Sequence, residues 1–99
     1  MSQLDSLVGM RLRSIEHVHD YVQLWFSAAT LSAYSKTDIS PSESALHKQC
    51  VVSVSFEPGI ALVLAFSNDA RVVVSALPDD YVGPEAFSVH FDSGVIVVE

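Results

Sequence analysis

Hydrophobic and polar residues alternate along most of this chain of 99 residues. In "YVQLWF" (21–26), the apolar side chains at 22, 24 and 26 share one face, and Tyr21, Gln23 and Trp25 share the other. A period of two is typical of a β-strand that buries one face. The runs "TLSAYS", "VVSVSF", "AFSVHF" and "VIVVE" show similar patterns. The chain therefore reads as strand after strand.

Turn residues separate these runs and join them into hairpins. Pro58 and Gly59 form a tight turn after "VVSVSF", because proline fixes its own φ and glycine accepts a positive φ. The runs "IALVLAF" (60–66) and "RVVVSAL" (71–77) are apolar on both faces, so both are expected to be covered on both sides. In the first strand the alternation inverts at Ser14 and Ile15, which predicts a β-bulge.

One segment breaks the alternation and predicts a short helix at about 41–49. Ser40 can cap a free backbone amide, Pro41 suits the first helical position, and Glu43 can reach back to the cap. Together the patterns predict a mainly β protein with one short helix. The expected fold is a single domain over 1–99, a small antiparallel sandwich or partly open barrel of about seven or eight strands.

The two halves of the chain resemble each other. Leu7 aligns with Leu46 at an offset of 39 positions, and Phe26 aligns with Phe66 at an offset of 40. The offset changes at the hairpin turn between the first two strands of each half. This predicts an internal repeat of 7–35 and 46–77, which chance matches between strands could also produce.

Composition narrows the classes of partner. Hydrophobic residues make up 49% of the chain and charged residues 17%, so an apolar face covered in a homodimer is expected. The net charge is −7 and the five basic residues are scattered, which excludes nucleic acid and anionic membranes as partners. The single cysteine, Cys50, and the lack of a signal-peptide pattern indicate a cytoplasmic protein.

Two histidines one residue apart raise the question of a metal site. His17 and His19 would share one face of a strand, and His90 could join them, as in the small β proteins called cupins. No glutamate follows His19 at the distance that a cupin needs, and two histidines are one ligand short of a catalytic zinc set. We therefore interpret "HVHD" as a polar hairpin end, and we expect no metal and no cofactor.

Two surfaces are candidates for binding. One is the strand face of Tyr21, Gln23 and Trp25, whose rings can cover apolar surface while they tolerate water. The other is the loop 77–87, with the side chains of Asp79, Asp80, Tyr81 and Glu85. No nucleophile elbow or phosphate-binding glycine loop is present in the sequence. These patterns favour a non-enzymatic protein–protein interaction module, and the alternative is a cupin-like metal- or ligand-binding enzyme.

Three stretches, "LVGMRLRSI", "DYVQLWFSAATLSAY" and "GPEAF", resemble a group of short bacterial proteins with no assigned function. The likeness spans most of the chain but consists largely of strand-like motifs. It implies no catalytic residues. Some members of such groups are immunity proteins that neutralise a toxin, so the resemblance and the acidic charge together suggest an acidic inhibitor of a basic partner.

Overall fold

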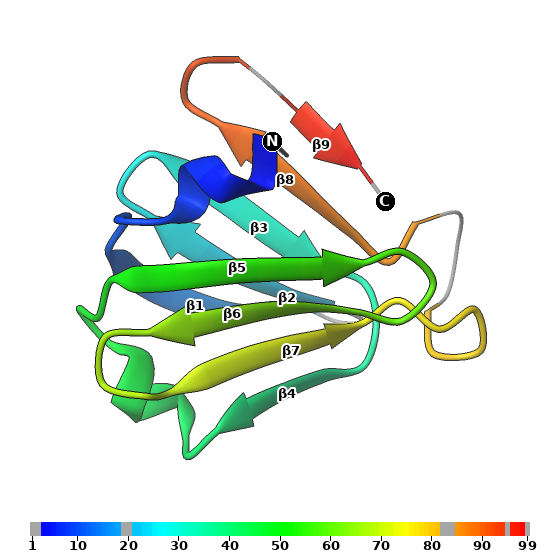
Figure 1. Ribbon diagram of the computed structural model, residues 1–99, viewed down its shortest axis with the longest axis horizontal. Coiled ribbons are helices and arrows are strands. Elements are labelled where there is room, and N and C mark those ends of the chain that lie inside the picture. Colours follow the sequence, from blue (N-terminus) through cyan, green and yellow to red (C-terminus); the bar gives the residue numbers. More distant parts are fainter. Residues whose placement is uncertain (1–2, 19–20, 82–84, 95, 99) are drawn as a thin grey trace.

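A computed structural model describes residues 3–18, 21–81, 85–94 and 96–98. Within these residues, nine antiparallel strands form two sheets that face each other as a sandwich (Figure 1). One sheet has five strands in the order β1 (Leu12–Val18), β2 (Tyr21–Phe26), β3 (Ala29–Ala33), β8 (Phe87–Phe91) and β9 (Ile96–Val98). The other has four, in the order β4 (Thr37–Ser40), β7 (Arg71–Ser75), β6 (Ala61–Phe66) and β5 (Val51–Glu57).

The predicted mainly β, antiparallel sandwich is confirmed, and the barrel alternative is not, because the two sheets stay separate. The structure has more strands than expected since the polar segment "TDIS" forms β4. Its Ile39 lies opposite Val72 of β7, so one apolar residue in that segment faces the core. The bulge predicted near Ser14 is present, as a shift of register between Leu12 and Ser14.

The helix expected at 41–49 is much shorter, a single 3₁₀ turn named η2 (Glu43–Leu46). Pro41 lies in a bend before it, and the side chain of Ser42 caps no backbone amide of the helix; its hydroxyl instead shares a hydrogen bond of 3.1 Å with that of Ser44. The helix ends because Lys48 has a φ of +65° and donates its backbone N–H to Leu12 O at 3.1 Å. A second 3₁₀ helix, η1 (Gln3–Leu7), was not expected from the sequence.

Neither short helix resembles a membrane segment: in the described part of the chain, none has the length and apolar character to cross a bilayer.

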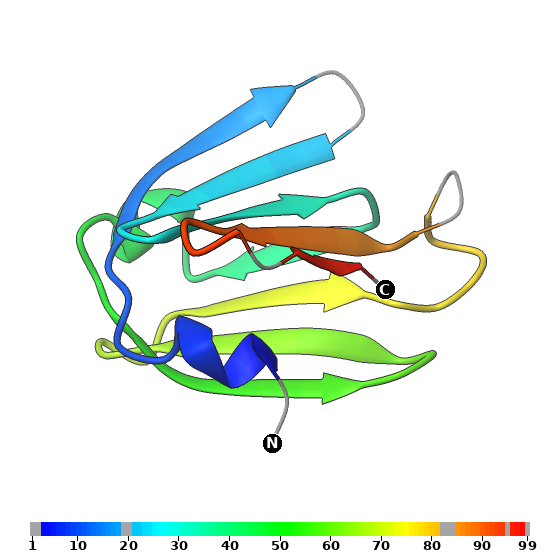
Figure 2. The ribbon, with the colours of Figure 1, turned by 90° about the horizontal axis from the view of Figure 1, so that it is seen from above.

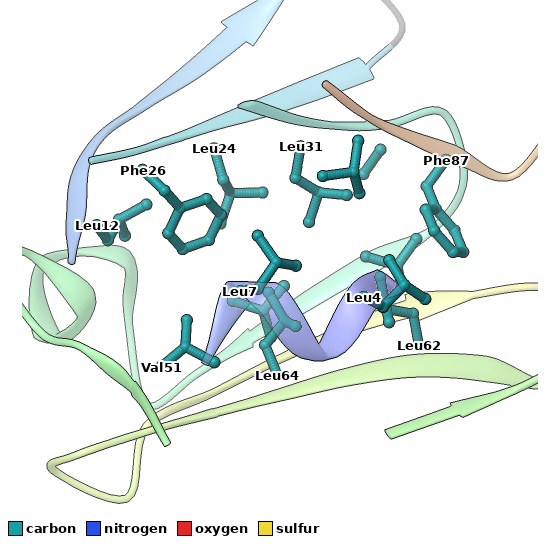
Figure 3. Packing of buried hydrophobic residues seen from close by; sticks show 14 of the residues in the cluster. Leu4, Leu7, Leu12, Leu24, Phe26, Leu31, Val51, Leu62, Leu64 and Phe87 are labelled. Atoms are coloured by element: carbon teal, nitrogen blue, oxygen red, sulfur yellow. The ribbon is translucent and has the colours of Figure 1, made fainter. Parts of the chain in front are cut away.

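The core lies between the sheets and is closed by leucines from the two 3₁₀ helices. Inward side chains of both sheets meet there, and Leu4 and Leu7 of η1 enter from one side (Figure 3). Leu46 of η2 is likewise buried. The hydrophobic residues of the core are Leu4, Leu7, Leu12, Leu24, Phe26, Ala29, Leu31, Ala33, Leu46, Val51, Leu62, Leu64, Phe66, Ala70, Val72, Val74, Ala76, Ala86, Phe87 and Val89.

The chain crosses between the sheets twice, in matching ways. β4 follows β3 but pairs with β7 in the opposite sheet, and β8 follows β7 but pairs with β3. Figure 2 shows β1 and β2 at one side of the molecule and β5 and β6 at the other. The first half therefore contributes one strand, β4, to the four-stranded sheet, and the second half contributes two, β8 and β9, to the five-stranded sheet.

The two halves also meet in reciprocal backbone hydrogen bonds beside an isolated bridge between Arg11 and Cys50. Leu12 N donates to Gln49 O, and Val51 N donates to Met10 O, both at 2.9 Å. These contacts join the beginnings of β1 and β5, so the two edge strands start from a common corner.

Corresponding positions of the two halves have matching surroundings. Leu12 pairs with Phe26 before the bulge in β1, and Val51 pairs with Phe66 before an equal bulge in β5. Gly9 and Lys48, 39 positions apart, both have positive φ. The repeat offers a simple explanation for these equivalences, but the duplication itself stays a prediction.

Leu46→Ala is expected to lower the free energy of unfolding by about 2–5 kcal/mol, because the side chain is fully buried and the change leaves a cavity. Val8→Ala is the control, since Val8 is 45% exposed and its truncation should change stability by less than about 0.5 kcal/mol. Urea denaturation of both variants measures the difference. Equal, small effects would show that η2 does not close the core.

Candidate functional site

Side chains of the five-stranded sheet that point away from the core form one mixed aromatic and polar surface. Tyr21, Gln23 and Trp25, the predicted binding residues of β2, lie on this outer side, because their neighbours Leu24 and Phe26 are buried. Cross-strand pairing extends the surface over β3 and β8. We call it the aromatic–polar face: Tyr21, Gln23, Trp25, Thr30, Ser32, Tyr34, Ser88 and His90.

Contacts among these side chains hold much of the face in place. Gln23 donates from Nε2 to Ser32 Oγ at 3.3 Å, and the hydroxyls of Tyr34 and Ser88 share a hydrogen bond of 3.4 Å. The rings of Tyr21 and Tyr34 pack with centroids 5.1 Å apart at an angle of 50°. Packing and hydrogen bonds of this kind fix side-chain rotamers before a partner arrives, which lowers the entropy lost on binding.

Trp25 stands between two hollows in this surface. On one side is a hollow of about 320 Å³ lined by Trp25 with Gln23, Thr30, Ser32, Tyr34 and His90. On the other is a hollow of about 400 Å³ lined by Trp25 with Arg13, Ser14 and Phe26. The side chain of Trp25 lines both hollows and the residue is 40% exposed, so a ligand in either one can reach it.

The four-stranded sheet provides an internal comparison for this face. Ser14 pairs with Trp25 just after the bulge in β1, and Ser53 pairs with Ala65 just after the bulge in β5. In the same way, the place of Gln23 is taken by Val63. A sheet of the same geometry thus forms with small aliphatic residues at these positions, so the fold itself does not require a tryptophan there.

A third depression lies beside β1, where η2 faces this edge strand. The cleft is about 350 Å³, with walls from Leu12, Ser14 and Ile15 on β1 and from Glu43, Ser44 and His47 on and next to η2. We call it the β1–η2 cleft.

An exposed ion pair links the two walls of the β1–η2 cleft. His17 Nε2 lies 2.8 and 2.9 Å from the two carboxylate oxygens of Glu43, and therefore donates its hydrogen to them. Both side chains are accessible, at 61% and 47%. Exposed pairs of this kind contribute about 1 kcal/mol or less to stability, so the pair orients its two side chains more than it holds the fold together.

The structure does not bring the histidines of the metal alternative together. His17 pairs with Val22 and shares its inward-facing side of the sheet, whereas His90 pairs with Thr30 on the outer face. His19 lies outside the described residues. Among the residues that are described, no group of three or more His, Cys, Asp or Glu side chains could hold an ion. His17 lies within β1, one residue before that strand ends at Val18, and the interpretation of "HVHD" as a polar hairpin end stays a prediction.

The acidic loop is more tightly attached than its sequence suggests. Ser75 Oγ donates to Asp80 Oδ2 at 2.6 Å, and Tyr81 pairs with Ser35 and packs against the core. Asp79 is exposed, and Glu85 is half-buried. Asp80 and Tyr81 therefore have structural contacts, and Asp79 is the more accessible carboxylate for a partner.

The sequence alone indicates few of the residues that complete these surfaces. Thr30, Ser32 and Tyr34 alternate in "TLSAY", so their common face was visible, but no local signal indicated that His90 would lie beside them. The cleft residues Glu43 and His47 fall within the segment 41–49, for which the sequence predicts a longer helix and no site. Only the approach of η2 to β1 gives them a site.

Comparison of the chain with protein-family models, with curated proteins and with solved structures found no match. The likeness to short bacterial proteins remains a matter of motifs, so the candidate site is defined by geometry alone.

Asp80→Asn is expected to lower the free energy of unfolding by about 1–2 kcal/mol, because a hydrogen bond to a carboxylate is stronger than one to an amide. Asp79→Asn removes the same charge from an exposed neighbour and should cost less than about 0.5 kcal/mol. Thermal denaturation of the two single variants separates these effects. If both variants have the melting temperature of the wild type, the contact of Asp80 with Ser75 does not stabilise the loop.

Proposed function

We propose that this protein is a non-enzymatic interaction module that binds a partner protein through the aromatic–polar face. The observation that supports this most directly is the exposed Trp25 at a position where the companion sheet has Ala65. A large aromatic side chain that the fold does not require, and that water reaches, is better explained by binding than by stability.

The chemistry of the face suits a protein interface. Tryptophan, tyrosine and arginine are the residues that most often dominate binding energy, and Trp25 lies beside Arg13 in one hollow and beside Tyr34 in the other. A tryptophan buries a large area at the cost of few rotatable bonds. The half-buried hydroxyl of Thr30 and amide of Gln23 can pair with a partner's polar groups, which limits the desolvation cost, whereas Ser32 is buried and accepts from Gln23.

Net charge adds a preference for a basic partner. The chain carries −7 in total, and a field of this sign raises the rate at which a positively charged protein arrives. Asp79 is exposed and can contribute to this attraction, which salt would screen. An acidic inhibitor or immunity-type protein in the cytoplasm is one form that such a module can take.

Trp25→Ala is expected to abolish capture of the partner from native cell extract while the fold is retained. Truncation of a central interface tryptophan typically costs 2 kcal/mol or more, which is about thirty-fold or more in affinity. Ile60→Ala is the control, because Ile60 is also apolar and is 55% exposed, but it lies in the turn between β5 and β6. Quantitative mass spectrometry of proteins retained by each immobilised variant provides the measurement.

The proposal requires a protein that is retained by the wild type and by Ile60→Ala but is lost with Trp25→Ala. Circular dichroism and unfolding curves of all three must agree, so that loss of fold does not imitate loss of binding. Retention of the same proteins by all three variants would exclude Trp25 from the contact surface.

We also propose that the chain forms a homodimer, as its apolar content suggests. Ala61, Val63, Ala65 and Val73 lie on the outer side of the four-stranded sheet and keep part of their surface exposed. Val63→Asp should then leave the fold intact and shift the mass seen in sedimentation equilibrium from twice 10.7 kDa to the monomer value. A wild-type protein that sediments as a monomer at micromolar concentration contradicts the dimer.

A further inference from the structure

The three depressions are neighbours, because each shares a lining residue with the next. The β1–η2 cleft and the Arg13 hollow share Ser14, and the Arg13 hollow and the His90 hollow share Trp25. Taken together they trace a path from η2, around the edge strand β1 at its bulge, and onto the outer face of β2, β3 and β8; we call this path the groove. β-Bulges at sheet edges are frequent beside functional sites, where they redirect a side chain.

We propose that this groove binds an extended segment of the partner protein, anchored by an aliphatic side chain in the β1–η2 cleft. The inference rests on the proposed function and names the chemistry of its partner. The anchor is followed by a basic residue, and the rest of the segment crosses the strands over Trp25 toward His90.

The walls of the β1–η2 cleft indicate an aliphatic anchor. Leu12 and Ile15 supply apolar surface on the β1 side, next to an opening of about 350 Å³ that a leucine or isoleucine side chain can enter. Burial of such a side chain contributes about 1.5–3 kcal/mol.

At the place where η1 lies beside β5, two other side chains occupy the positions that correspond to Glu43 and His17. At the position 39 residues before Glu43, η1 carries Leu4, which is only 2% exposed and belongs to the core. Likewise Phe56, which packs against the core, takes the place of His17 in the other half. At η1 the chain's own leucine fills this place, whereas at η2 Glu43 and His17 stand at the corresponding positions and the cleft beside them is open.

Charge on the groove selects the residue next to the anchor. Glu43 lies at the cleft with a carboxylate that is 47% accessible, and Glu16 lies opposite Gln23 on the outer face. His17 donates to Glu43, and Arg13 adds a positive charge at the next hollow. A lysine or arginine of the segment is therefore favoured only close to the anchor, on the side of the two glutamates, in agreement with the net charge of −7.

The length of the groove sets the length of the segment. Neighbouring strands are about 4.8 Å apart, so the path from β1 to β8 covers about 14 Å, and the cleft beside β1 adds about 5 Å. A peptide that rises about 3.3 Å per residue crosses this distance in about six residues. Such a contact buries less than about 1,200 Å² in total, which is typical of transient binding.

A saccharide is the other ligand that could cross an exposed tryptophan flanked by hydroxyl and amide groups. It has no aliphatic branch for the cleft and no cation for Glu43. The peptide is therefore the better fit, and saccharides serve as a separate arm of the test.

The test uses ¹⁵N-labelled full-length protein and synthetic hexapeptide pools as probes. In one pool the first two positions are Leu and Lys, in a second Ser and Lys, in a third Leu and Glu, and the other positions are random. Trp25 is the only tryptophan of the chain, so its indole N–H gives one unambiguous NMR signal for the groove. Cellohexaose and chitohexaose are added in parallel at equal concentration.

Two variants test the anchor without touching the aromatic–polar face. Ser44→Phe places a ring in the β1–η2 cleft, where Ser44 is exposed and lines the wall. Asp5→Phe places the same ring at the corresponding exposed position of η1, 39 residues earlier, and is the matched control. Amide spectra of both variants establish that the fold is retained.

The Leu-Lys pool is expected to shift the signals of the Trp25 indole and of the amides at 12–15 and 44–47. Its affinity should exceed those of the other two pools at least fivefold. Ser44→Phe should weaken its binding at least tenfold, and Asp5→Phe should leave it within twofold.

Three results would overturn the inference: no shift at millimolar peptide, equal shifts from the Leu-Lys and Ser-Lys pools, or shifts with the saccharides alone. The proposed function is judged separately by extract capture. A partner that is lost with Trp25→Ala but retained by Ser44→Phe would keep the interaction module and remove the anchored segment.

Discussion

The backbone crossing at Arg11 and Cys50 is the contact on which the arrangement of both sheets depends. Four hydrogen bonds surround it, from Gly9 and Leu12 on one side and from Lys48 and Val51 on the other. Buried or partly buried amides must find partners, and here each half satisfies the other. The crossing joins the starts of β1 and β5, which are edge strands of the two sheets. Of the 3₁₀ helices, η1 lies beside β5 and η2 lies beside β1.

The exchange of β4 and β8 between the sheets has a consequence for stability. Each sheet is completed from the other half, by β4 in one case and by β8 and β9 in the other, so neither half can bury its inward face alone. The interior is continuous from Leu7 to Leu46, and both leucines are fully buried. Loss of packing at either leucine should therefore destabilise both sheets, as expected for a small domain with one core.

Differences between the halves carry more functional information than their likeness. Where the geometry is equal, packing makes equal demands, and the residue types should be similar. Two positions depart from this expectation: Trp25 stands where the other half has Ala65, and Glu43 stands where the other half has Leu4. Both residues line the proposed groove. The binding role proposed above accounts for both, since neither the exposed carboxylate of Glu43 nor the exposed ring of Trp25 adds to the core.

The sequence by itself determined the class of fold, because alternation with a period of two indicates which side chains are buried, whichever strand lies alongside. It also located the bulge near Ser14, where the alternation inverts, and the face of Tyr21, Gln23 and Trp25. It overestimated the helix at 41–49, since capping residues describe how a helix begins but not how soon the chain must turn away to pair with Leu12.

Only the tertiary structure decided which strands are neighbours. The exchange of β4 and β8 places His90 beside Thr30 and separates it from His17 by the thickness of the sheet. The approach of η2 to β1 likewise forms the cleft between Ile15 and Glu43. Such contacts join residues far apart in the chain, and their energy comes from closing a common core, which no local pattern records.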